Sequence, residues 1–194
     1  ICEVKKRQKG YFAELLKTAR MSSIKDKTFE SFKPMNKNQS DALEIIRANH
    51  RGYYLFGKYG VGKSHLMTAT AIKAINHNVP SVLFSVPMLL SEIRRSQLED
   101  VEIEKRCQFI PYLILDDIGK EKSTEWVQER LFLLIDERYK RFEQKKGHTS
   151  FTSQFSIKDL RQRLDEAITS RISGMCKEIY LNGDDYRIKG GVDI

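Results

Sequence analysis

Short segments rich in apolar, aromatic and β-branched residues alternate along the chain with longer segments of helical periodicity. The short segments predict five strands, at 53–56, 81–85, 112–115, 148–153 and 177–181. Strands that alternate with helices are typical of a parallel sheet with helices on both faces. The pattern therefore predicts an α/β fold of three layers.

The longest predicted helix runs from about 123 to 142, and Ser123 or Thr124 is expected to cap its start. The apolar residues of its buried face are Val127, Leu131, Leu134 and Ile135. Other predicted helices cover 4–20, 36–49, 64–76, the charged region 87–109 (as one helix or two) and two short stretches before 172. The segment 23–35 is expected to be extended, with Phe29 and Phe32 pointing inward.

The stretch GKYGVGKS at 57–64 follows the first predicted strand and opens a predicted helix. It matches the phosphate-binding pattern G-x-x-x-x-G-K-[ST] in its strand–loop–helix context. Its glycines let backbone N–H groups turn inward around a phosphate. Lys63 is expected to reach the β- and γ-phosphates of ATP and Ser64 to ligate Mg²⁺, while the helix N-terminus adds partial positive charge. The expected nucleotide-binding residues here are Gly57, Lys58, Tyr59, Gly60, Val61, Gly62, Lys63, Ser64 and His65.

Two carboxylates, Asp116 and Asp117, end the apolar strand at 112–115. Ligands bind at the carboxyl ends of strands in open α/β sheets. We expect Asp116 to hold Mg²⁺ together with Ser64, and Asp117 to orient or deprotonate the attacking water. Aspartate in the second position shortens the reach of the base, so slow ATP hydrolysis is predicted.

Further positions are candidates for chemistry or for contact with the nucleotide. Gln154, with Ser153 and Thr152 as rivals, follows the next strand and is the candidate for placing water near the γ-phosphate, with turn or cap chemistry as the alternative role for all three. Phe32 and Gln39 are candidate base contacts, with packing as the alternative role. Arginines near the chain's end, at 171 and 187, carry no role from their sequence context alone.

Lys and Arg number 34 against 26 Asp and Glu, which leaves a net charge of +8 and predicts affinity for polyanions such as nucleic acid. A solubilising surface is the alternative. Cys2, Cys107 and Cys176 are odd in number and widely spaced, which favours a reducing cytoplasm, with a truncated zinc motif at Cys2 as an alternative. No apolar run of about 18 residues and no signal-like segment supports a membrane span or secretion.

The stretches TFESF, YLFGKYGVGKSHL, LILDDIGKEKSTEWVQERLFLLIDERY, FTSQF, SRI and DDYR resemble the ATPase domain of bacterial replicative helicase loaders of the DnaC/DnaI type, within the AAA+ superfamily. The resemblance covers about 28–187 and is most specific over 113–139. Transposition helper ATPases of the IstB type share nearly all of these motifs.

The resemblance implies a P-loop NTPase fold of three α/β/α layers, with a parallel five-stranded sheet and without the full helical lid of other AAA+ proteins. It places Gln154 where the family usually has a sensor asparagine. It identifies Arg171 with the arginine finger that acts on a neighbouring subunit's nucleotide, and Arg187 with the second sensor arginine. It implies two domains here: 1–22 as a basic linker or remnant of a missing N-terminal domain, and 23–194 as the AAA+ domain.

The resemblance also implies partners. Loaders of this family carry an N-terminal domain that binds a DnaB-family replicative helicase, and they associate in an ATP-dependent manner. The insertion at 87–109 matches one that contacts single-stranded DNA in initiator-type relatives. Its candidate phosphate contacts are Arg94, Arg95, Lys105 and Arg106.

The leading hypothesis is an ATP-dependent loader that binds single-stranded DNA and helps load a hexameric replicative helicase. An IstB-like helper of DNA transposition, acting on duplex DNA with a transposase, is the nearest alternative. A P-loop kinase for a small metabolite and a nucleotide-switched scaffold with negligible turnover are alternatives of other classes.

Overall fold

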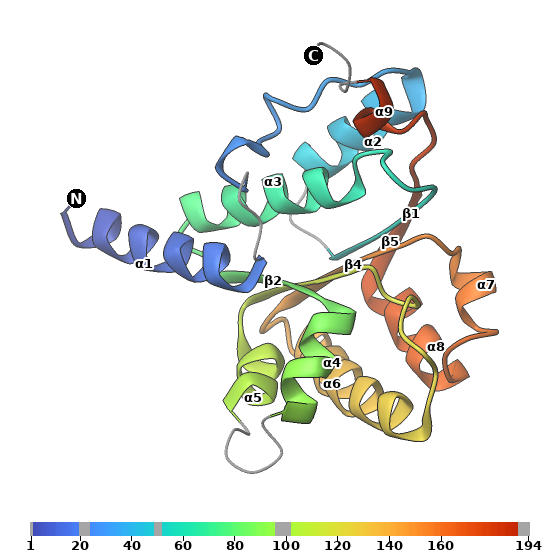
Figure 1. The fold of residues 1–194 in the computed structure, drawn as a ribbon. Coiled ribbons are helices and arrows are strands. Elements are labelled where there is room, and N and C mark those ends of the chain that lie inside the picture. Colours follow the sequence, from blue (N-terminus) through green and yellow to red (C-terminus); the bar gives the residue numbers. More distant parts are fainter. Residues whose placement is uncertain (1, 20–23, 49–51, 96–101, 190–194) are drawn as a thin grey trace.

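The computed structural model describes residues 2–19, 24–48, 52–95 and 102–189. Its strands are β1 (Gly52–Phe56), β2 (Ser81–Ser85), β3 (Tyr112–Asp116), β4 (His148–Ser153) and β5 (Cys176–Tyr180). They form one sheet in the order β2-β3-β4-β1-β5, and every neighbouring pair is parallel (Figure 1). The predicted parallel five-stranded sheet is confirmed.

Helices cover both faces of the sheet. One face carries α1 (Cys2–Ala19), the short 3-10 helix η1 (Ile24–Asp26), α2 (Lys37–Ala48) and α3 (Lys63–Asn76). The other face carries α4 (Val86–Arg95), α5 (Glu102–Phe109), α6 (Glu125–Glu143), α7 (Ile157–Leu160) and α8 (Glu166–Met175). The last element, α9 (Tyr186–Lys189), lies beside α2 in Figure 1.

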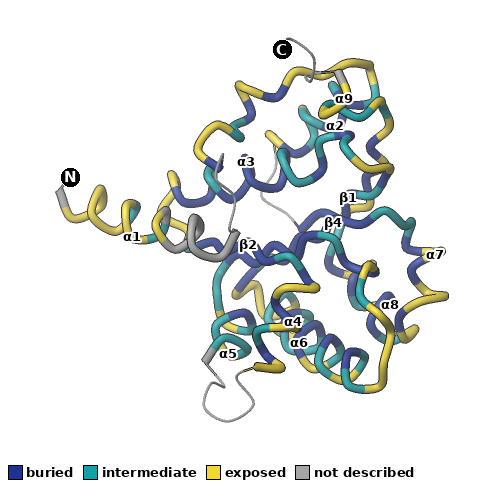
Figure 2. Tube along the Cα trace, viewed as in Figure 1, coloured by how far each residue is buried: buried dark blue, intermediate teal, exposed yellow. Residues whose placement is uncertain are grey.

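Strand β3 shows why the central strands read as continuous apolar runs. Leu113 and Leu115 pack into the core under α4 to α8, whereas Tyr112 and Ile114 pack into the core under α2 and α3. A strand with helices on both faces has no solvent-facing side, so its apolar residues do not alternate with polar ones. Figure 2 shows the resulting band of buried backbone through the sheet.

The boundaries of α6 follow from its cap. Thr124 is the residue before the helix, and its Oγ1 accepts a hydrogen bond from the backbone N–H of Val127 at 3.3 Å. Of the two predicted capping residues, Thr124 is therefore the cap. The four predicted core residues of this helix are all buried.

The charged region after β2 contains two helices in the described part of the chain, α4 and α5, and residues 96–101 lie outside it. Arg138 of α6 ties α5 to the sheet. Its fully buried guanidinium donates to the carbonyl oxygens of Gln108, Ile110 and His148 at 2.6–2.9 Å and to Thr149 Oγ1 at 2.8 Å. One side chain thus joins the end of α5, β4 and α6.

The basic N-terminal segment forms the predicted helix, α1, which packs against β2 and α3. Gln8 Nε2 donates to the carbonyl oxygen of Asn76 at 2.8 Å. The basic side chains of Lys5, Lys6 and Lys9 are exposed. The side chain of Cys2 lies outside the described residues, and a domain boundary at 22 stays a prediction.

No helix in the described part of the chain combines the length and the apolar character needed to cross a membrane.

Candidate nucleotide-binding site

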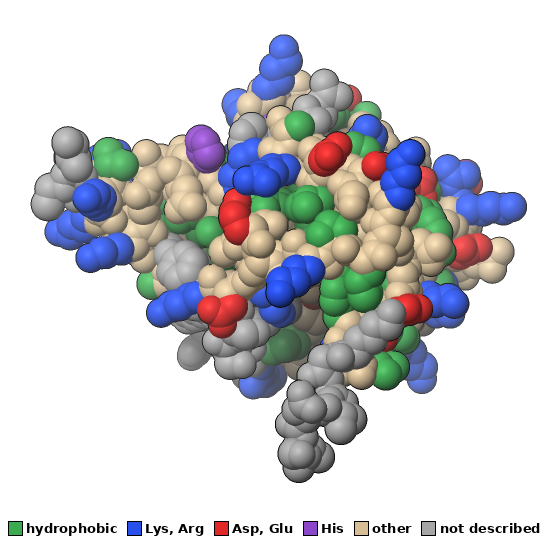
Figure 3. Space-filling model, turned by 90° about the horizontal axis from the view of Figure 1, so that it is seen from above, with side chains coloured by type: hydrophobic (Ala, Val, Ile, Leu, Met, Phe, Trp, Pro, Cys, Tyr) green, Lys and Arg blue, Asp and Glu red, His purple; other side chains and the backbone are tan. Residues whose placement is uncertain are grey.

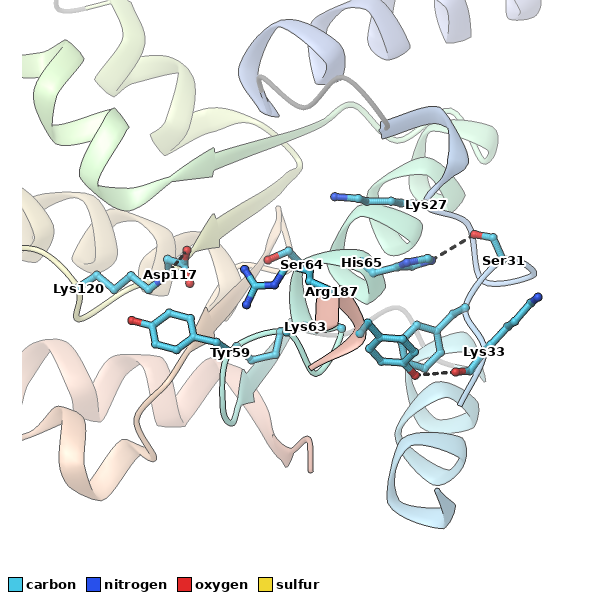
Figure 4. A pocket seen from close by; sticks show the side chains of 14 residues that line it. Lys27, Ser31, Lys33, Tyr59, Lys63, Ser64, His65, Asp117, Lys120 and Arg187 are labelled. Atoms are coloured by element: carbon cyan, nitrogen blue, oxygen red, sulfur yellow. Dashed lines mark hydrogen bonds and ion pairs between the residues drawn. The ribbon is translucent and has the colours of Figure 1, made fainter. Parts of the chain in front are cut away.

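A pocket of about 460 Å³ lies at the carboxyl ends of β1 and β3, beside the first turn of α3. Its described lining comes from four segments, at 27–33, 59–65, 117–120 and 186–187 (Figure 4). The charged side chains among these are Lys27, Lys33, Lys63, Asp117, Lys120 and Arg187, with His65 beside them. Cations therefore dominate the wall, which suits an anionic ligand. Figure 3 shows Lys and Arg side chains spread around the face of the molecule seen from above.

The phosphate loop ends in a helix start that suits an anion. Gly62 precedes α3 with φ 96°, and no side chain caps the helix. The first N–H groups of a helix lack intrahelical partners and attract anions. Lys63 opens the helix, is buried, and donates from Nζ to the carbonyl oxygens of Gly57 at 2.8 Å and Lys58 at 2.7 Å. Burial lowers the pKa of the Lys63 ammonium, and the carboxylates of Asp117 and Asp116 oppose this shift.

The predicted metal residues meet in the structure. Ser64 Oγ lies 2.9 Å from both carboxylate oxygens of Asp116, which is buried. Thr152 Oγ1 donates to Asp116 Oδ1 at 2.5 Å. Burial raises the pKa of the Asp116 carboxyl, and the hydrogen bond from Thr152 opposes this shift. A hydroxyl and a carboxylate side by side are oxygen ligands of the kind that Mg²⁺ prefers, so the donor set fits that ion.

Asp117 lines the pocket next to this pair and adopts a left-handed backbone, with φ 65°. Its N–H donates to Thr152 Oγ1 at 2.9 Å. Its carboxylate oxygen Oδ2 lies 2.7 Å from Lys120 Nζ. We call Asp117 and Lys120 the ionic end of the pocket.

Three rings form the opposite, aromatic end: Phe32, His65 and Tyr186. The Phe32 centroid lies 5.3 Å from that of His65 and 5.8 Å from that of Tyr186. His65 Nε2 lies 2.8 Å from the carbonyl oxygen of Thr28, and burial lowers the pKa of its imidazole. Phe32 thus stays a candidate base contact.

Gln39, the second candidate base contact, is fully buried beneath the aromatic end and is absent from the described lining. Its Oε1 accepts from the N–H of Met35 at 2.7 Å and lies 3.0 Å from the Tyr186 hydroxyl oxygen. Packing is therefore the role that the structure supports for Gln39.

The remaining loop residues differ in exposure. Val61 is fully buried in the core, and Lys58 and Tyr59 are exposed. Tyr59 lines the pocket, whereas the contribution of Lys58 is the carbonyl oxygen that accepts from Lys63.

A C-terminal segment, residues 181–187, runs along the phosphate loop, and we call it the C-terminal strap. Its first N–H, from Leu181, donates to the Phe56 carbonyl oxygen at 2.8 Å, and the N–H of Tyr186 donates to that of Gly60 at 3.1 Å. A Cβ added to Gly60, whose φ is 70°, would lie 1.8 Å from Asp185 Oδ1. The left-handed backbone favours glycine at this loop position, and a side chain there would displace the Asp185 carboxylate.

The strap carries Arg187 into the pocket, as its predicted nucleotide role requires. Its guanidinium also pairs with Asp185, with Nη2 at 2.7 Å from Oδ2. Sequence reasoning expected no helix here, because the four residues of α9 are too few to show a helical period.

Two predicted catalytic residues, Gln154 and Arg171, are absent from the described lining of the pocket. Arg171 lies on α8, where its Nε donates to Asp136 Oδ1 at 2.8 Å and its guanidinium stands 4.9 Å from the Phe132 ring centroid. Gln154 follows β4, but the hydroxyl beside Asp116 belongs to Thr152, one of its rivals. A role for Arg171 in a neighbouring subunit and a sensor role for Gln154 stay predictions.

Sequence reasoning missed Lys120. It lies in the loop after the acidic strand end, and its ammonium stands 4.7 Å from the Tyr59 ring centroid. Lysine in a charged loop carries no pattern that separates it from Lys122 two residues later, which is absent from the described lining of the pocket.

Curated relatives include replication proteins and proteins of mobile elements. The replicative helicase loader DnaI of Bacillus subtilis (strain 168) is 33% identical over 114 residues, which are 57% of this chain and 35% of that protein. The phage-like element PBSX protein XkdC of the same strain is 26% identical over 191 residues, 94% of this chain and 68% of that protein. The insertion sequence IS232 ATP-binding protein of Bacillus thuringiensis subsp. berliner is 29% identical over 141 residues, which are 69% of this chain and 54% of that protein. The chain thus spans about a third of the length of the DnaI loader.

Solved structures share the fold. The crystal structure of the DnaC helicase loader matches with a TM-score of 0.74 and 26% identity, over 84% of this chain and 100% of that one. The DnaI crystal structure matches with a TM-score of 0.72 and 25% identity, over 85% of this chain and 93% of that one. The fold is that of AAA+ P-loop NTPase domains, as predicted. The family model of the IstB-like ATP binding proteins matches residues 3–192, and this chain belongs to that family.

Proposed function

We propose that this chain binds ATP with Mg²⁺ and hydrolyses it slowly to ADP and phosphate. The observation that carries the proposal is the contact between Ser64 and Asp116, placed beside the buried Lys63 at a helix start without a side-chain cap. A hydroxyl, a carboxylate and an ammonium in this arrangement match the needs of a metal-bound triphosphate.

Each residue has one task in this proposal. Lys63 donates to the β- and γ-phosphates in place of the carbonyl oxygens of Gly57 and Lys58. Ser64 and Asp116 would hold Mg²⁺, which neutralises phosphate charge when bound. Asp117 accepts a proton from the water that attacks the γ-phosphorus, and the bond to the β-phosphate oxygen breaks. Arg187 stabilises negative charge on the phosphates from the strap.

We infer further that the chain is the ATPase part of a helicase loader. The similarity to the DnaI and DnaC loaders supports this inference. In this role the protein binds single-stranded DNA, associates with copies of itself when ATP is bound, and acts with a DnaB-family replicative helicase. A cytoplasmic location fits the free thiols of Cys107 and Cys176.

Basic residues at the end of α4 and within α5 are the proposed DNA contacts. Arg95 and Lys105 are exposed, and Arg94 is exposed with its guanidinium 4.6 Å from the Trp126 ring centroid. Arg106 is half-buried. Phosphate contacts of this kind add affinity that falls with salt concentration.

A second candidate is a helper ATPase of DNA transposition. The family model and the similarity to the IS232 protein favour it. The nucleotide chemistry is the same in both candidates, and they differ in the DNA form that is bound.

The test is binding of fluorescently labelled DNA at equal protein concentration with ATP, with ADP and without nucleotide. The loader reading expects ATP to tighten binding of single strands, and expects Lys63→Met to remove both ATP binding and this effect. The double variant Arg95→Ala/Lys105→Ala should weaken DNA binding and leave ATP binding intact. ATP-dependent preference for duplex DNA would favour the transposition helper, and single-strand affinity that ignores ATP would overturn the loader reading.

A further inference from the structure

Lys120 contacts both the acidic end of β3, at Asp117, and the phosphate loop, at Tyr59. It follows β3 in the loop that starts at Asp117, and its Nζ lies 2.7 Å from Asp117 Oδ2. The same ammonium stands 4.7 Å from the ring centroid of Tyr59, which belongs to the phosphate loop. The side chains of Lys120 and Asp117 are each 28% exposed, and both line the pocket.

The fold, rather than a chance surface contact, sets the position of Lys120. The carboxylate of Glu121 accepts from the N–H of Gly119 at 3.0–3.1 Å and closes a tight turn around Lys120. Ile118, on the other side, is fully buried, and its N–H and carbonyl oxygen bond to Thr152 and Ser153 of β4 at 2.9 and 2.7 Å. The loop is therefore anchored to β4 two residues before the lysine, and a local hydrogen bond closes the turn around it.

The two ends of the pocket differ in the residues that line them. In Figure 4, Lys120 and Asp117 lie at one side, Lys33 lies at the opposite side, and Lys63 and Ser64 lie between them. Lys33 adjoins the aromatic end, since its carbonyl oxygen accepts from the Tyr186 hydroxyl at 2.6 Å. Rings suit a base and the helix start suits phosphates. A nucleotide laid along this axis turns its last phosphate toward the ionic end.

We propose that Lys120 is a γ-phosphate ligand that exchanges partners with the nucleotide state, an inference that rests on the proposed ATP-binding function. Without a γ-phosphate, the ammonium holds the Asp117 carboxylate. With ATP bound, it moves to the γ-phosphate, whose oxygens carry more negative charge than one carboxylate, and Asp117 becomes free to receive the proton of water. ADP lacks the group that draws Lys120 away, so Lys120 makes the site prefer ATP over ADP.

The experiment measures dissociation constants for ADP and for a non-hydrolysable ATP analogue with a β,γ-methylene bridge, by calorimetric titration. The variants are Lys120→Met, which keeps length and removes charge, and Lys120→Arg, which keeps charge. Lys122→Met is the matched control on the exposed side of the same loop. Loss of one charge-assisted hydrogen bond predicts that Lys120→Met weakens analogue binding about tenfold. ADP binding should stay at the wild-type value, and Lys120→Arg and Lys122→Met should retain the preference for the analogue.

The outcomes distinguish the role of Lys120 from the proposed ATP-binding function. Equal weakening of both nucleotides by Lys120→Met, or no weakening of either, overturns the role of Lys120 while leaving the ATP-binding function in place. A wild-type protein that binds neither nucleotide overturns the proposed function and this inference together. A thermal unfolding curve of Lys120→Met that matches wild type shows that the variant is folded.

Discussion

The hydroxyl of Thr152 donates to Asp116 Oδ1 at 2.5 Å across the neighbouring strands β4 and β3, and Thr152 Oγ1 itself accepts from the N–H of Asp117 at 2.9 Å. One threonine therefore orients a carboxylate that fits a metal and the backbone of the proposed base. Both contacts are buried or half-buried, so water cannot easily replace them.

Replacement of Thr152 by valine keeps the branched shape and removes both contacts. We expect the free energy of unfolding to fall by about 1–3 kcal/mol, because Asp116 stays buried with one partner fewer. Urea denaturation followed by circular dichroism measures this change. Thr152→Ser retains the hydroxyl and should lie near wild type, and a valine variant of wild-type stability would contradict the importance of the contact.

Asp117→Asn tests the proposed base without disturbing the backbone. Asparagine tolerates the left-handed conformation that Asp117 adopts, whereas alanine would add strain. Phosphate release should slow by about 10²-fold or more, since a general base contributes that much, and ATP binding should persist. Unchanged turnover would remove Asp117 from the role of base.

Arg171→Ala tests whether a neighbouring subunit completes the site. Because Arg171 lies outside the described lining of its own pocket, we expect hydrolysis to fall only at protein concentrations where subunits associate. Turnover measured across a dilution series, beside sedimentation, gives the answer. A loss of activity in a strictly monomeric sample would contradict the assignment.

Asp136 predicts a pH effect on stability. A free aspartate has a pKa of about 4. The hydrogen bond from Lys140 and the nearby charge of Arg171 hold the pKa of Asp136 below that value. A depressed carboxyl pKa contributes stability above the unfolded-state pKa, and this contribution is lost as pH falls through the lower folded-state pKa. Asp136→Asn should therefore cost about 1 kcal/mol or less at pH 7, since the ion pairs are partly exposed, and the cost should shrink below pH of about 4. A cost that persists at pH 2–3 would assign the effect to packing.

Arg138→Met predicts the largest loss of stability in this set. The methionine keeps part of the volume but leaves buried carbonyl oxygens without a donor, so unfolding should become easier by about 3 kcal/mol or more. Chemical denaturation measures it, with the exposed Arg161→Met as control. A small effect would mean that water or another side chain replaces the guanidinium.

Sequence reasoning succeeded where the physical signal was local. The five strands lie within one or two residues of their predicted bounds, because each pairs an apolar or β-branched run with a clear turn signal. Lys63, Ser64 and Asp116 were predicted together, since a phosphate loop and an acidic strand end each read directly from short motifs. The structure brings Ser64 into contact with Asp116, and Lys63 and Ser64 line the same pocket.

Sequence reasoning was weakest where position depends on distant segments. Whether Thr152 or Gln154 faces Asp116 depends on the register between β3 and β4, which no local pattern encodes. Lys120 lines the pocket from a loop in which Glu121 bonds back to Gly119, and no local sequence pattern predicts that placement. The C-terminal strap reaches Gly60 from far along the chain, and only the folded structure places them together.

The C-terminal strap also sets how far the chain can be shortened at its C-terminal side while the nucleotide pocket stays complete. A protein shortened after β5 would retain every strand of the described sheet and the whole phosphate motif, yet it would lack the main-chain bond to Gly60, the Tyr186 ring and Arg187. Such a fragment would be a poor candidate for crystallisation with nucleotide or for inhibitor screening. Expression boundaries for this protein are therefore better drawn beyond α9, with fusion tags kept away from that end.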